Sequence, residues 1–168
     1  MAWADEIVPM VRALINDTSE STPTYSDSVL EDAVVIAAQL MTQFEVDFDI
    51  CYTMSIASVS ITPDPTGFGG TNPRDNSFIN LAALKTAMII LQGQIQGIAL
   101  QAVRITDGPS SIDYTEAARM VRKNFDEIKA QYEHARMQYQ AGNRVGLAVI
   151  SKGREYRPWW TPWVGGPY

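Results

Sequence analysis

The chain has 168 residues with 13 Lys and Arg, 19 Asp and Glu, one cysteine and one histidine, which leaves a net charge of −6. This length suits a single domain, and we expect neither a signal peptide nor a transit peptide. A lone cysteine excludes an internal disulfide, and together with a lone histidine it cannot form a zinc site or a Cys–His nucleophile pair. The acidic balance argues against ordinary nucleic-acid binding, which needs cations to displace the counterions of phosphate.

The charges are unevenly distributed along the chain. Residues 1–73 contain eleven acidic residues and one base, Arg12, whereas residues 143–168 contain four bases and one acidic residue, Glu155. This polarity suggests head-to-tail contact between copies, or docking to a partner.

Two amphipathic segments open the chain. Asp5 is a candidate cap for a first helix near residues 6–16, and Pro9 requires this helix to start near residues 5–7, because proline is tolerated only in the first turn. Ser28, with Glu31 three residues later, fits a capping box and predicts a second helix over residues 28–44. Apolar residues recur through it at helical spacing, at Val29, Leu30, Ala33, Val34, Ile36, Ala37, Leu40, Met41 and Phe44.

The hydrophobic period then changes. Apolar and polar residues alternate from residue 48 onward, which predicts a strand over Phe48–Ile61. Thr62–Asn76 contains three prolines and three glycines and is therefore a long loop. Its Gly-rich phrase lacks the Lys-Ser/Thr pair of a phosphate-binding loop. Loops of this length usually have a function or are mobile.

The segment Phe78–Leu100 is apolar on nearly every side, which predicts a helix that is buried all round. Asn76 and Ser77 are its candidate N-caps. Its uninterrupted apolar run is too short for a membrane span, which needs about 20 residues, and Lys85 lies inside it. We therefore expect a mainly α fold, a helical bundle around this central buried helix.

The remaining elements complete this expectation. Ala102–Thr106 fits a second strand and Ser111–Asp113 a short return, so that with the strand at Phe48–Ile61 they would form a small antiparallel β element. Thr115 caps a long amphipathic helix that reaches about Gln140, and Gly142 ends it.

The last part of the chain differs in composition. We divide the protein into a helical domain with a β insertion, residues 1–142, and an extended, basic, Trp-rich C-terminal arm, residues 143–168. Residues 145–150 fit one strand; after them, glycines and prolines deny the arm a helix, and we expect it to be disordered or extended in a free subunit. Trp and Arg dominate interface hot spots, so the arm is the predicted partner-binding site. Its candidate contact residues are Arg154, Tyr156, Arg157, Trp159, Trp160, Trp163 and Tyr168.

Catalytic motifs are missing from the sequence. There is no GxSxG elbow, and His134 lies among charged residues of the long predicted helix. Asp47 and Asp49 are the nearest approach to a metal pair, and they are more simply read as two carboxylates facing solvent. We therefore expect no enzyme, and no catalytic, metal-binding or cofactor-binding residue.

Several short phrases follow one another in a recognisable order. The first helix ends in Ile-Asn-Asp at residues 15–17, and Tyr-Ser-Asp-Ser-x-Leu at residues 25–30 enters the second. Asp-Asn-Ser-Phe-Ile-Asn-Leu at residues 75–81 enters the central helix, and Ile-Thr-Asp-Gly-x-x-x-Ile-Asp at residues 105–113 precedes the long one. In this order, over about residues 5–140, the chain resembles the head-to-tail connector, or adaptor, proteins of tailed bacteriophages.

The resemblance implies a helical bundle with a small β element that assembles as a twelve-fold ring beneath the portal. Such a ring, assembled in the host cytoplasm and located in the virion neck, extends the DNA channel and offers a platform to the next neck or tail protein. It implies no cofactor, no membrane and no specific DNA binding, and an acidic channel wall would repel phosphate. We expect the arm to dock on the portal or a neighbouring copy, and the loop Thr62–Asn76 to lie near a subunit boundary or face the channel.

Two alternatives remain open. The chain could be a helical partner-binding module that docks a client through its aromatic arm. The arm itself could fold back on its own domain, with its tryptophans capping the core. Native mass measurement addresses the first alternative, and truncation after Ile150 addresses the second.

Overall fold

The computed structural model describes residues 2–19, 23–70, 72–104 and 111–148. Within these ranges the protein is mainly helical, with four helices and a two-stranded antiparallel sheet, which confirms the predicted fold class. The elements in chain order are α1 (Ala2–Leu14), α2 (Asp27–Phe44), β1 (Thr53–Ser55), β2 (Ser60–Thr62), α3 (Asn76–Arg104) and α4 (Ser111–Ala148).

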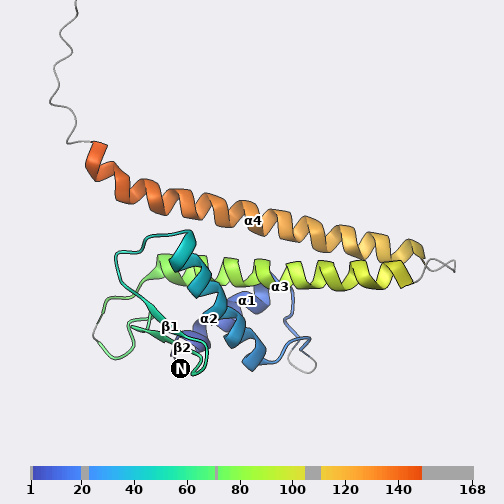
Figure 1. Ribbon diagram of the computed structural model, residues 1–168, viewed down its shortest axis with the longest axis horizontal. Helices are drawn as coiled ribbons and strands as arrows, with labels where there is room; N and C mark the ends of the chain where they lie inside the picture. The colour runs from blue at the N-terminus through green and yellow to red at the C-terminus, as the bar shows by residue number, and fades with distance from the viewer. Residues whose placement is uncertain (1, 20–22, 71, 105–110, 149–168) are drawn as a thin grey trace, which may run out of the picture.

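Helix α3 is the centre of the fold. It contacts α1, α2 and α4, and α1 and α2 also contact each other. Figure 1 shows α3 and α4 side by side, with α1, α2 and the β-hairpin gathered around the N-terminal part of α3. The C-terminal part of α3 and the N-terminal part of α4 therefore project together beyond the compact body.

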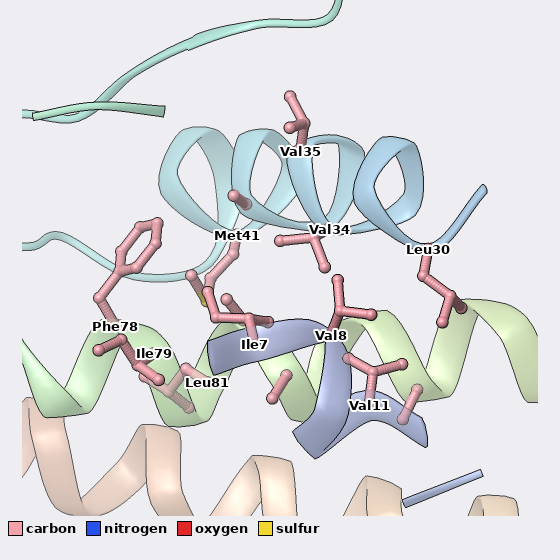
Figure 2. Close-up of a cluster of buried hydrophobic side chains, with 14 of the residues drawn as sticks. Ile7, Val8, Val11, Leu30, Val34, Val35, Met41, Phe78, Ile79 and Leu81 are labelled. Atoms are coloured by element: carbon pink, nitrogen blue, oxygen red, sulfur yellow. The ribbon is translucent and has the colours of Figure 1, made fainter. Parts of the chain in front are cut away.

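Side chains from three helices interlock in the core (Figure 2). Ile7 of α1, Val34 of α2 and Leu81 of α3 are at most 2% exposed. Fully burying an aliphatic side chain of this size contributes about 1.5–3 kcal/mol. Val35 points away from this cluster in Figure 2, yet it is also fully buried, and α2 contacts β1 on its other side. Helix α2 is thus held between the helical core and the hairpin.

The predicted ends of the first two helices need correction. Helix α1 begins at Ala2, so Pro9 lies well inside the helix rather than in its first turn. The buried side chains of Trp3 and Ala4 explain this, because their packing adds a turn before the proline. The N-cap of α2 is Ser26, not Ser28; its side chain accepts a hydrogen bond from the backbone N–H of Val29 at 3.4 Å.

The single strand predicted over Phe48–Ile61 is wrong. The structure has a short hairpin there, in which β1 pairs antiparallel with β2 and Met54 lies opposite Ile61. Phe48 precedes the hairpin and packs on Phe78 of α3, with ring centroids 5.2 Å apart. The alternation that suggested one strand therefore comes from an aromatic contact followed by two strands.

The other three predicted strands, at Ala102–Thr106, Ser111–Asp113 and residues 145–150, are wrong wherever the structure describes them. Ala102–Arg104 is the last turn of α3, and Ser111–Asp113 is the start of α4. Gly142 does not end α4, which continues to Ala148, so residues 145–148 of the third predicted strand are helical. Residues 105–106 and 149–150 lie outside the described residues. Extending a formed helix costs little per residue, and this outweighs weak local strand preference.

Helix α3 passes a length and hydropathy test for a membrane span. The most apolar 18-residue window within residues 76–98 has a mean hydropathy of 1.3, and half of that window is buried within the protein. Three other helices pack against it, which is the setting of a core helix in a helical bundle. Asp75 caps it, since its Oδ1 accepts a hydrogen bond from the N–H of Phe78 at 2.9 Å, in place of the predicted caps Asn76 and Ser77.

A polar cluster joins α4 to the body. Glu45, just after α2, accepts hydrogen bonds from Lys85 of α3 and from the hydroxyl of Tyr132 on α4. The side-chain amide of Gln140 donates to the backbone carbonyl of Glu45 at 3.2 Å. Burial opposes the charge on Glu45, but the hydrogen bonds from Lys85 and Tyr132 outweigh it and lower the pKa of the carboxyl group. Burial, together with the Glu45 carboxylate, raises the pKa of the Tyr132 hydroxyl above its ordinary value, so this group stays a donor.

We predict that Glu45→Gln destabilises the protein by about 1–3 kcal/mol at pH 7, because Lys85 loses its charged partner in a site that is largely closed to water. The folded pKa of Glu45 is below its ordinary value of 4.5. Its stabilising contribution is therefore complete above pH 4.5 and is lost as the pH falls through the folded pKa. Urea unfolding from pH 7 to pH 3 should show the difference between the two proteins shrinking below pH 4.5.

The control for this experiment is Glu133→Gln. Glu133 lies on α4 and its side chain is 49% exposed, at 4.0 Å from Lys129. An exposed pair of this kind contributes at most about 1 kcal/mol, so this variant should unfold like the parent. Equal effects of the two substitutions would contradict a special role for Glu45.

Candidate functional site

The residues that the sequence predicts to bind a partner lie outside the described residues. They all fall in the interval 149–168, and their role stays a prediction. Residues 143–148 of the predicted arm belong to α4. The described part of the chain nevertheless offers surfaces that a partner or the arm could occupy. The predicted residues are Arg154, Tyr156, Arg157, Trp159, Trp160, Trp163 and Tyr168.

Helix α2 carries apolar side chains on a second face, away from the core. Val34 represents the core face and is fully buried. Val29, Ile36, Leu40 and Phe44 form a row at spacings of seven, four and four residues, which places them on one side of the helix. They are 50%, 39%, 38% and 77% exposed, and we call these four residues the α2 stripe.

Helical periodicity alone does not separate this stripe from the core, because every apolar residue of the helix fits one periodic pattern. The sequence does contain a signal for a second apolar face, because the apolar residues of this helix span a wider arc than one packed face requires. Contiguous exposed apolar residues of this kind commonly mark an interaction surface.

An open hollow lies beside the end of the stripe, between α2 and α4. Its volume is about 380 Å³. A second hollow of about 250 Å³ shares several of its lining residues and extends to Tyr52. Both are open to solvent and are wide enough to receive an aromatic side chain. The first hollow is lined by Thr42, Gln43, Phe44, Glu45, Val46, Asp47 and Gln140.

One exposed carboxylate, Asp47, lines both hollows, and Asp49 follows two residues later in the chain. Asp47 and Asp49 are exposed, as the sequence predicts for solvent-facing carboxylates, and neither forms an ion pair with another described residue. Within the described ranges no group of three or more His, Cys, Asp or Glu residues is placed to hold a metal ion. This surface therefore places two exposed carboxylates, which attract cations, next to the apolar α2 stripe.

The one base of the first 73 residues is used inside the body. Arg12 donates to Asp17 at 2.9 Å, to the carbonyl of Tyr25 at 2.9 Å and to Asp27 at 2.6 Å. Hydrogen bonds from the backbone N–H groups of Thr24 and Tyr25, with the charge of Arg12, lower the pKa of Asp17. Arg12 thus closes the loop between α1 and α2. Among the described residues, Glu6 pairs with Arg74 and Glu45 with Lys85, whereas no ion pair is found for Asp5, Asp32, Asp47 or Asp49.

The long loop before α3 has a defined conformation in its described residues. Asp64 accepts hydrogen bonds at its Oδ1 from the backbone and the hydroxyl of Thr66, and the N–H of Asp75 donates to the carbonyl of Pro65 at 2.9 Å. Gly67 has φ +77°, and an added Cβ would lie 3.2 Å from backbone atoms of residues 72 and 74. This loop presents Phe68, which is 76% exposed. Its location at a subunit boundary or channel stays a prediction.

No family model, curated protein or solved structure matches the chain.

We predict that Gly67→Ala destabilises the protein by about 1–3 kcal/mol, since it combines a left-handed backbone with a close backbone contact. Gly69→Ala is the matched control, because Gly69 also has positive φ, at +96°, but has nothing within 4 Å of an added Cβ. Gly69→Ala should reduce the free energy of unfolding by less than Gly67→Ala does, because only Gly67→Ala adds a close contact with the backbone.

Phe68→Ser should leave the free energy of unfolding unchanged within about 0.5 kcal/mol, as for surface substitutions generally. Thermal and urea unfolding should therefore show the largest loss of stability for Gly67→Ala, a smaller loss for Gly69→Ala and almost none for Phe68→Ser. A large loss of stability in Phe68→Ser would mean that the ring supports the fold instead of facing a partner.

Proposed function

We propose that the protein is a connector subunit of the virion neck of a tailed bacteriophage, which forms a ring beneath the portal. Three of the four sequence phrases that carry the resemblance lie at the ends of described helices, which supports it. Residues 15–17 directly follow α1 and supply Asp17, which accepts a hydrogen bond from Arg12. Residues 25–30 begin α2 with its Ser26 cap, and residues 75–81 begin α3 with its Asp75 cap.

The observation that carries the proposal is the long pair α3–α4, which projects beyond the body (Figure 1). A helix pair of this kind gives each subunit a long edge along which copies can pack. On α4, Met120 is 70% exposed and Met137 is 61% exposed. Methionine is flexible and polarisable, and it suits helix faces that must adapt to a partner.

The charge of the body fits a channel wall. Exposed carboxylates such as Asp5, Asp32 and Asp47 face solvent, and the α2 segment contains no base. An acidic wall repels phosphate and lets DNA pass without specific binding. The proposed partners are the portal, other copies of the chain and the next neck or tail protein.

The test of the ring combines native mass spectrometry with negative-stain microscopy of the purified chain. We predict a closed assembly with a central hole. The double variant Met120→Glu and Met137→Glu should fold normally by circular dichroism and associate at least about tenfold more weakly, because charges replace apolar contacts between copies.

The control is Gln131→Glu with Gln138→Glu, which adds the same charge at two exposed positions of α4. It should assemble like the parent. A chain that stays monomeric with portal present and binds one client would contradict the ring and favour the partner-binding module. If the double methionine variant assembled like the parent, Met120 and Met137 of α4 would not be part of the contact between copies.

A further inference from the structure

Helix α4, after which residues 149–168 follow, contacts the segment just after α2. The Gln140 side chain of α4 donates to the carbonyl of Glu45, directly after α2, and the N–H of Asp49 donates to the Tyr139 hydroxyl at 3.3 Å. Helix α4 ends at Ala148, about 12 Å further along its axis than Gln140. The described chain therefore ends about 12 Å beyond the point where α4 contacts the segment that follows α2.

We propose that residues 149–168 dock along the α2 stripe of their own chain. Their tryptophans lie over the stripe and in the hollow beside Phe44, and Arg154 and Arg157 face Asp47 and Asp49. The contact gives one physical explanation for two features that otherwise lack one, an exposed apolar row and a segment rich in tryptophan.

Charge complementarity supports this occupant. Residues 149–168 contain Lys152, Arg154 and Arg157 against Glu155. The receiving end of α2 has two exposed carboxylates, Asp47 and Asp49, without an ion pair among the described residues. The carbonyl end of a helix dipole adds negative potential at the same place.

The lengths also agree. The chain from Ala148 to Arg154 can span about 20 Å when extended, which is enough to turn back beside Asp47. From Arg157 to Trp163 it covers about 20 Å more. The stripe from Val29 to Phe44 is about 22 Å long, so the tryptophans reach most of it.

The same geometry selects the chain's own α2 over a neighbouring protein. The sequence alone favours a neighbouring subunit or the portal as the arm's partner, because it does not place α2 beside the end of α4. Because Gln140 of α4 holds the segment after α2 about 12 Å before the end of α4, the arm meets its own stripe at high effective concentration.

Disulfide trapping in the full chain tests the proposal. Cys51 is the only cysteine, so Cys51→Ser gives a clean background. Gln43→Cys lines the hollow, and Thr161→Cys lies among the tryptophans. We expect the double-cysteine chain to form an intrachain disulfide at least about ten times faster than the control pair Ala57→Cys with Thr161→Cys, because a docked arm holds a high effective concentration. Ala57 is exposed in the turn of the hairpin.

Tryptophan fluorescence supplies a second readout. Trp3 is 2% exposed and contributes a constant buried signal, so a change reports the other three tryptophans. Leu40→Glu should shift the emission to longer wavelength, whereas Ile56→Glu, at a position 52% exposed in the hairpin turn, should not. Asp47→Lys with Asp49→Lys should slow the intrachain disulfide.

Three results would overturn the proposal. They are equal trapping rates for the two cysteine pairs, disulfides that form only between chains when singly substituted proteins are mixed, and identical emission from Leu40→Glu and the parent. The contact lies within one chain, so it is decided separately from the ring. A monomer with a docked arm would contradict the ring alone, and a ring with free arms would contradict this contact alone.

Discussion

The packing of α4 against the rest of the protein depends on the carboxylate of Glu45, which follows α2 and contacts both α3 and α4. Lys85 of α3 and Tyr132 of α4 both donate to it, and the Lys85 ammonium lies 5.2 Å from the centre of the Tyr132 ring. Arg136 lies close enough to help lower the pKa of Glu45. A charge in this setting must be matched, because an unmatched one costs several kcal/mol of desolvation. The cluster therefore fixes where α4 lies along the body, and with it the place where residues 149–168 begin.

Aromatic packing extends this constraint to the hairpin. The ring centroids of Tyr52 and Phe78 are 4.1 Å apart, and those of Phe48 and Tyr139 are 5.2 Å apart. The hydroxyl of Tyr52 also donates to Asp75 at 2.9 Å. Asp75 thus caps α3 with one carboxylate oxygen and holds the segment before β1 with the other. Segments far apart in sequence meet around the first turn of α3, so the position of that helix organises both the loop and the hairpin.

Helix α2 contributes one face to the hydrophobic core and a second, apolar face to the surface. Its Val34 side chain packs in the core and its Val35 side chain lies on the hairpin side, while Phe44 stays 77% exposed. An apolar row left uncovered would favour nonspecific association. In the proposed intrachain contact, the chain's own basic arm would cover this row in the free subunit. The exposed methionines of α4 remain available for contacts between copies in the proposed ring.

The sequence by itself determined the mainly helical fold, the four helical segments, the central place of α3 and the acidic body, because hydrophobic period and charge are local properties. It placed Ser28 and Gly142 wrongly at helix ends and predicted strands at Ala102–Thr106 and Ser111–Asp113, whose described residues are helical, since helix ends and short strands depend on contacts with distant residues. Only the tertiary structure divided the apolar residues of α2 between a buried face and an exposed stripe. Periodicity shows only where the apolar positions of a helix lie. Whether a given face is buried depends on which other elements pack against it, and long-range contacts such as that of Glu45 with Tyr132 decide this.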